Sequence, residues 1–95
     1  MDKGLRWHTV YIKLIKDERV SVWHISIYLA FVHLWIHNGS NNPIRVSRKI
    51  IMQLARIKGI ATYHKCIKEL QKFGYIEYHP TYDYYKGTKV FLSGL

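Results

Sequence analysis

Apolar residues near the N-terminus recur at the spacing of one helical stripe, which predicts an amphipathic helix ending at the polar run 17–19. Residues 22–37 are apolar almost all round, and Ser21 precedes them as a candidate N-cap. We therefore expect this second helix to be the central one, packed on several sides. The residues of the N-terminal stripe, at i, i+3, i+4, i+7 and i+8, are Trp7, Val10, Tyr11, Leu14 and Ile15.

The middle of the chain predicts shorter elements after a turn cluster at 38–43. Residues 44–46 suit a brief strand, and Ser47 is a candidate N-cap for a third helix over 48–56. We expect Gly59, next to Lys58, to break this helix, because glycine adopts backbone angles that other residues resist. The inward face predicted for the third helix consists of Ile50, Ile51, Leu54 and Ala55.

A fourth helix is predicted over 60–73, followed by Gly74 as its C′ residue. Residues 75–79 and 88–92 alternate as strands do, and the 80–87 segment between them is too long for a tight turn. The order of elements predicts a mainly helical α+β fold. The apolar stripe of the fourth helix consists of Tyr63, Cys66, Ile67, Leu70 and Phe73.

The composition indicates one domain, 1–95, with a basic middle section. Ninety-five residues are too few for two cores, and a hydrophobic fraction of 48% is enough for one. Between residues 44 and 74, eight Lys and Arg residues face Glu69 alone, a net charge of +7 out of +9 for the chain. Solvated surfaces usually mix both signs, so this section favours an anionic partner.

Other chemistry finds little support in the sequence. Cys66 is the single cysteine, and we expect a buried free thiol in a reducing cytoplasm. His33 and His37 stand at i, i+4, but no Cys or carboxylate completes a metal site, so we expect them packed in or near the core. The acidic residues do not assemble with a nucleophile and a base. We therefore expect no enzymatic activity, no cofactor and no small-molecule effector.

The sequence also predicts a location. Residues 1–6 are polar and charged, with no apolar run behind them, so we expect no secretory signal. The longest apolar stretch, 22–36, contains two histidines and is shorter than the roughly twenty residues that a membrane span needs. We expect a cytoplasmic, nucleoid-associated protein with no membrane partner.

Two short helices joined by a glycine-containing turn, then a basic helix and a hairpin, are typical of a winged helix-turn-helix core, here 21–95 with 1–20 as an N-terminal helical extension. A helix fits the DNA major groove, so we expect groove contacts from the fourth helix, with an ordinary solvated face as the alternative. The candidate DNA-contacting residues there are Lys58, Ile60, Thr62, His64, Lys65 and Lys68.

Two further segments are candidates for contact with the DNA backbone. Ser47, Arg48 and Lys49 fit phosphate anchors, with simple helix capping as the alternative. In the 80–87 loop, we expect at least one tyrosine to fold back onto the core and the others to face the backbone. The loop residues concerned are Tyr82, Tyr84, Tyr85 and Lys86.

Several motifs, which together span most of the chain, resemble those of a known family. The chain resembles small winged-helix DNA-binding proteins of Bacteroidetes, often found near mobile or conjugative elements. The sequence Lys58-Gly59-Ile60 departs from the Gly-Ser-Lys expected there, which removes a serine cap and places an apolar side chain at the helix start. The segments that carry the resemblance are 21–26, 42–44, 47–48, 61–70, 74–80 and 86–90.

The resemblance implies a winged helix that binds double-stranded DNA, and three functions stay open. The first is a sequence-specific transcriptional regulator with the 60–73 helix in the major groove and the 80–87 loop as a wing. The second is an excisionase-like or replication-accessory architectural factor of a mobile element, and the third is a protein-interaction winged-helix module. A homodimer is a further possibility, because one winged domain makes a small DNA interface.

Overall fold

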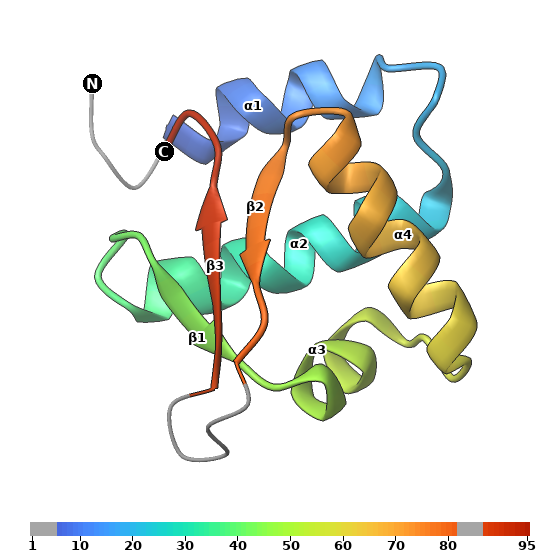
Figure 1. The fold of residues 1–95 in the computed structure, drawn as a ribbon. Coiled ribbons are helices and arrows are strands. Elements are labelled where there is room, and N and C mark those ends of the chain that lie inside the picture. Colours follow the sequence, from blue (N-terminus) through green and yellow to red (C-terminus); the bar gives the residue numbers. More distant parts are fainter. Residues whose placement is uncertain (1–5, 82–86) are drawn as a thin grey trace.

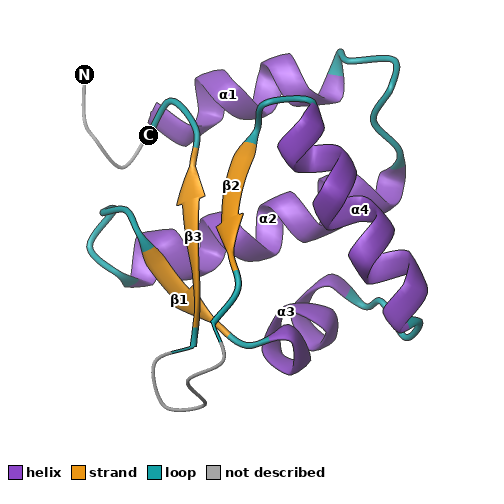
Figure 2. Cartoon of the chain, in the orientation of Figure 1, coloured by secondary structure: helices purple, strands orange, loops and turns teal. Residues whose placement is uncertain are grey.

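The structure is a computed structural model that describes residues 6–81 and 87–95. It contains four helices and one three-stranded sheet, a mainly helical α+β arrangement that confirms the predicted order of elements (Figures 1 and 2). Three predicted ends differ from the observed ones by a single residue. The elements are α1 (Arg6–Ile15), α2 (Val22–His37), β1 (Ile44–Val46), α3 (Arg48–Ala55), α4 (Ile60–Lys72), β2 (Ile76–His79) and β3 (Thr88–Leu92).

Helix α2 is the centre of the fold, as its all-round apolar sequence predicted. α1 and α3 lie on opposite sides of it, and α4 and the sheet pack alongside (Figure 1). Its largest fully buried side chains include Trp35, Tyr28 and Phe31. Burial of side chains of this size is the main favourable contribution to folding, so α2 determines where the other helices can lie.

The sheet is antiparallel in the order β1-β3-β2, so β3 is the central strand. Val90 of β3 lies opposite Ile44 on one side and Tyr78 on the other. Asn42 lies two residues before β1, and its side chain makes the hydrogen bonds that a strand backbone would make there. Its Oδ1 accepts the Leu92 N–H and its Nδ2 donates to the Leu92 carbonyl, both at 3.0 Å. These two hydrogen bonds join the turn after α2 to Leu92, the last residue of β3.

Helix α3 buries fewer of its apolar residues than the sequence predicted. Of the four residues predicted to face inward, Ile51 and Ala55 are buried, but Ile50 and Leu54 are 47% and 44% exposed, so the prediction is wrong for these two. The reason is that this eight-residue helix packs mainly against α2, and one i, i+4 pair is enough to fill that contact.

The turn from α3 to α4 begins earlier than expected. Arg56, not Gly59, ends α3: it adopts a left-handed conformation with φ of 60°, and the Ile57 N–H donates to the Met52 carbonyl at 3.0 Å. Gly59 instead is the N-cap of α4 with φ of −90°, an angle open to any residue. The Ser26 hydroxyl of α2 donates to the Ala55 carbonyl and satisfies one more of the free acceptors at this helix end.

Helix α4 follows its predicted pattern. Tyr63, Cys66, Ile67 and Leu70 are buried, and Phe73 is partly buried just after the helix. Cys66 is a buried free cysteine, as predicted, and burial raises the pKa of its thiol. Gly74 has φ of 86° at the C′ position, and the N–H groups of residues 74 and 75 donate back into the last turn at 3.0 and 2.9 Å.

A buried histidine joins the start of α2 to α4. The Ser21 N–H donates to Nδ1 of His24 at 2.8 Å, so Nδ1 carries no proton; Nε2 then carries it and faces Oε1 of Glu69 at 3.2 Å. His24 is 3% exposed. The expectation of core positions for His33 and His37 is wrong, because both lie on the exposed side of α2, with their ring centroids 4.5 Å apart.

A second polar cluster joins the α1–α2 connection to the end of α4. The Tyr75 hydroxyl donates to Oδ2 of Asp17 at 2.8 Å, and the Arg19 guanidinium contacts the same carboxylate at 2.6 Å while lying 4.3 Å from the centroid of the Phe73 ring. Hydrogen bonds from Arg19 hold the pKa of Asp17 far below its usual range. Burial and the bond to Asp17 raise the pKa of Tyr75 to about 12.

Among the described residues, no helix is both long enough and apolar enough to cross a membrane.

Replacing His24 with alanine should lower the free energy of unfolding by about 1–3 kcal/mol, because the Ser21 N–H and the Glu69 carboxylate lose their partner at a half-buried site. Urea unfolding followed by circular dichroism measures this. The matched control is His33→Ala on the exposed side of the same helix, which should change stability by less than about 0.5 kcal/mol. Equal losses from the two variants would contradict the assigned role of His24.

The stability contributed by Asp17 should depend on pH. Because the pKa of Asp17 is lowered by folding, its contribution is complete above the ordinary aspartate pKa of about 3.9 and is lost as the pH falls below that value. Asp17→Asn should therefore unfold at a lower temperature than the wild type at pH 7. The difference should shrink progressively below about pH 4. A difference that stays constant from pH 7 to pH 3 would contradict the assignment.

Candidate nucleic-acid interface

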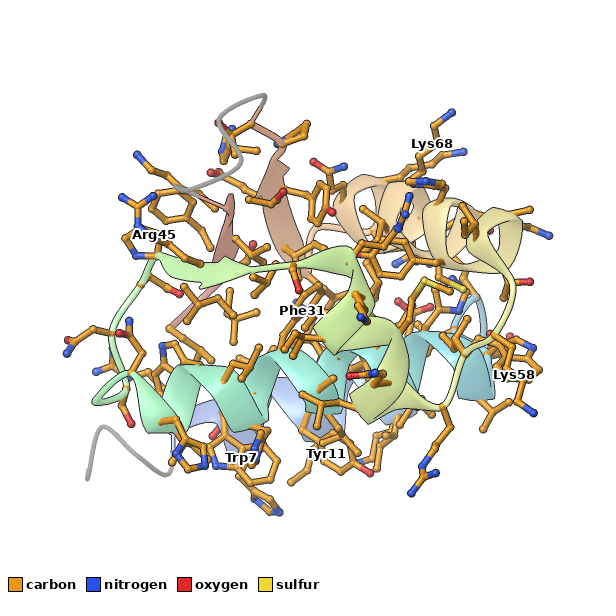
Figure 3. The ribbon with its side chains drawn as sticks, turned by 90° about the horizontal axis from the view of Figure 1, so that it is seen from below. Trp7, Tyr11, Phe31, Arg45, Lys58 and Lys68 are labelled. Carbon is orange, nitrogen blue, oxygen red and sulfur yellow. The ribbon has the colours of Figure 1, made fainter. Side chains whose placement is uncertain are left out.

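The outward side of α4 carries the basic residues of that helix. His64, Lys65 and Lys68 are exposed on the side opposite the buried stripe, and Thr62 is half-buried at its edge. In Figure 3 the Lys68 side chain extends away from the body of the protein. The 3.6-residue period of the helix places the apolar stripe inward and the lysines outward, as the sequence predicted.

Two of the predicted positions lie where α4 begins. Lys58 in the turn and Ile60, the first helical residue, are both exposed, and Lys58 lies at an edge of the molecule in Figure 3. The N-cap here is Gly59, which has no side chain to accept from the first N–H groups of the helix. The structure therefore leaves the first turn of α4 open, with an apolar side chain beside it.

The start of α3 supplies the second predicted group. The Ser47 hydroxyl accepts the Ile50 N–H at 3.2 Å, so the capping role of Ser47 is confirmed. Arg48 and Lys49 follow in the first turn, and both are exposed. β1 leads directly into α3, so the first turn of α3 follows the end of that strand (Figure 1). The predicted loop residues Tyr82, Tyr84, Tyr85 and Lys86 lie outside the described residues.

A row of three basic side chains crosses the outer face of the sheet. Arg45 of β1 lies opposite Lys89 of β3, which in turn lies opposite His79 of β2. All three are exposed and line a hollow of about 260 Å³ together with residues at the base of the 80–87 loop. We call Arg45, Lys89 and His79 the sheet row.

Sequence reasoning anticipated only part of the sheet row. It predicted the strand at 44–46 that carries Arg45, but His79 and Lys89 were not among the predicted contacts. Alternation within each strand could have indicated that the two side chains face outward. Only the pairing of β1 with β3 brings the three together.

The electrostatics of these surfaces are one-sided. Within 6–81 and 87–95, the ion pairs are Arg19–Asp17, His24–Glu69 and His79–Glu77, so Lys65 and Lys68 of α4 have no carboxylate partner there. Glu69, the single acid between residues 44 and 74, faces His24 on the inner side of α4. Within the sheet row, Arg45 and Lys89 are cations at opposite positions, which destabilises a sheet, whereas His79 contacts the carboxylate of Glu77 at 3.4 Å.

The basic surfaces lie on one side of the molecule. In Figure 3, Arg45 and Lys68 are both on the side away from Trp7 and Tyr11 of α1. The candidate basic surfaces are thus three groups that are separate in sequence: the outward side of α4, the first turn of α3 and the sheet row. Among the residues that the structure describes, no group of three or more His, Cys, Asp or Glu side chains could hold a metal ion.

Comparison with protein-family models, with curated proteins and with solved structures finds no match for this chain.

Lys89→Gln should raise the free energy of unfolding at low ionic strength by about 0.2–1 kcal/mol, because it removes the central charge of the sheet row. Thermal unfolding at rising NaCl concentration measures the effect, and the gain should diminish as salt screens the repulsion. Lys13→Gln removes the same charge from the exposed side of α1 and should give no gain. A lower stability of Lys89→Gln at low salt would contradict the repulsion.

Proposed function

We propose that this chain is a winged helix-turn-helix protein that binds double-stranded DNA as a sequence-specific transcriptional regulator. The single observation that carries the proposal is the outward side of α4, where Lys65 and Lys68 extend from a helix whose opposite side is buried. A B-DNA major groove is about 12 Å wide and admits a helix of about 10–12 Å diameter. α4 spans thirteen residues, enough to reach along such a groove.

The order of elements supports this use of α4. α3 and α4 are joined by the short turn 56–59, and β2 and β3 follow as a hairpin beside them. In a winged helix the second helix of the pair lies in the groove, and the first rests across the backbone. In the proposed complex, α3 supports α4, and the 80–87 loop is the wing.

Phosphate contacts in the proposed complex come from two sides of α4. Arg48 and Lys49 extend from the first turn of α3, and the sheet row lies at the base of the wing. Contacts of this kind position a protein on DNA without reading its sequence. A phosphate seated on the sheet row would offset the repulsion between Arg45 and Lys89.

Base contacts and phosphate contacts should affect DNA binding in different ways. On a duplex selected from random sequences, Lys65→Ala should lower affinity by about 1–3 kcal/mol, and it should have a much smaller effect on unselected duplex. Lys89→Ala should weaken both duplexes by similar factors and reduce the slope of log K against log salt by about 1. Gel-shift titrations at several salt concentrations measure all of these values.

Lys13→Ala is the matched control, because it removes one exposed charge from α1, which is not part of the proposed interface. It should leave the preference for the selected duplex unchanged. Sequence-blind losses of equal size from Lys65→Ala and Lys89→Ala would contradict the division between base and phosphate contacts. A wild-type affinity that does not fall with salt would contradict DNA binding and favour a protein-interaction module.

A further inference from the structure

A groove of about 590 Å³ runs along the outward side of α3 toward the start of α4. Four cationic side chains line it: Arg48 and Lys49 in the first turn of α3, Arg56 at its end, and Lys58 in the turn to α4. No carboxylate is among the lining residues. The groove therefore attracts anions along its whole length.

The same groove also presents apolar side chains. Met52 is partly buried against the core and lines the groove with the rest of its surface, Ile60 beside it is 48% exposed, and the buried Ile57 forms part of the floor. Surfaces that hold ligands are mostly apolar with a few charged groups that fix orientation, and sites of about 300–1,000 Å³ are typical. The groove has both properties.

A second hollow of about 290 Å³ lies on the other side of the α3–α4 turn. It shares Arg56, Ile57 and Lys58 with the groove and adds Trp23 of α2, which is 49% exposed. The two hollows form one surface that crosses the turn, which we call the turn groove. Trp, Met and Arg, which the turn groove presents as Trp23, Met52 and Arg56, are among the residue types enriched where proteins bind other proteins.

We infer that the turn groove is a docking site for an acidic segment of a partner protein that carries large apolar side chains. Carboxylates of such a segment would pair with Arg48, Arg56 and Lys58, and its apolar side chains would cover Ile60 and Trp23. A phosphodiester backbone would use the cations but gain nothing from the apolar side chains. A small molecule would fill one hollow and leave the other open.

The inference goes beyond the proposed DNA binding and assigns a second ligand to part of the same surface. The residues that belong both to the turn groove and to the proposed DNA interface are Arg48, Lys49, Lys58, Ile60 and Thr62, so the acidic segment and the duplex compete. Arg56 and Trp23 were not among the predicted DNA contacts. They therefore separate the two activities.

The probe is a short fluorescent synthetic peptide in which Asp alternates with Leu around a central Trp, and binding to the full chain is measured by fluorescence anisotropy. Its companion has the same charges, with Ser in place of Leu and Trp. The apolar peptide should bind at least about tenfold more tightly than the companion, because burial of one large apolar side chain contributes about 1.5 kcal/mol or more. Equal binding of the two peptides would overturn the inference.

Arg56→Glu should weaken binding of the apolar peptide by about tenfold, since an attraction of up to about 1 kcal/mol becomes a repulsion of similar size. Gln53→Glu introduces a carboxylate into the groove at an exposed helical position and should act in the same direction. Lys72→Glu makes the same charge change as Arg56→Glu on α4 outside the turn groove and is the matched control. An equal loss in Lys72→Glu would show a general charge effect and overturn the inference.

An apolar contact gives a second, charge-neutral test. Ile60→Ser, at the exposed first position of α4, should weaken the apolar peptide by about tenfold and leave the companion peptide unchanged. Thermal unfolding of every variant verifies that it is folded. If Ile60→Ser and Arg56→Glu instead weaken duplex DNA and leave the peptide unaffected, the groove is a nucleic-acid surface and the inference fails.

A failure of the proposed DNA binding can be distinguished from a failure of the proposed docking site. Loss of duplex binding is measured with Lys65→Ala, whose side chain is outside the turn groove. Peptide binding with the expected variant pattern supports the docking site even if no duplex binds, and duplex binding without the peptide pattern overturns the docking site alone.

Discussion

The fold depends on covering most of the surface of α2. Because this helix is apolar around most of its circumference, α1, α3, α4 and the sheet pack against it with their own apolar sides turned inward, while Trp23, His33 and His37 stay exposed. That requirement fixes the rotation of α4 about its axis. Tyr63 and Leu70 point to the core, and Lys65 and Lys68 point outward. The basic surface is therefore a consequence of core packing.

The acids of the chain reinforce this arrangement by being used internally. Glu69 faces the buried His24, and Asp17 joins Arg19 to Tyr75. Each contact stabilises a junction between α4 and a neighbouring segment, and each removes a carboxylate from the basic surfaces. The sheet row differs, since Arg45 and Lys89 lie opposite each other, and the exposed Glu77 contacts His79 of the same row.

The helical pair α3–α4 presents two surfaces of different chemistry. The outward side of α4 is polar and cationic, which suits a DNA groove, whereas the turn groove combines cations with Met52, Ile60 and Trp23. The shared cationic residues Arg48, Lys49 and Lys58 connect the two. In the proposed scheme, an acidic partner that occupies the turn groove competes with DNA. The same basic segment then binds DNA and allows the partner to regulate that binding.

The sequence by itself determined the elements and their order, because helical periodicity, N-cap serines and the C′ glycine act over only a few residues. It also placed Lys65 and Lys68 on the outside. Only the tertiary structure decided which histidine is buried, since His24 depends on Glu69 forty-five positions away. The same holds for the sheet row, which requires β1 to pair with β3, and for Ile50 and Leu54, which α2 has no room to cover. Contacts between distant segments are set by how the whole core packs, and that information is not contained in any local pattern.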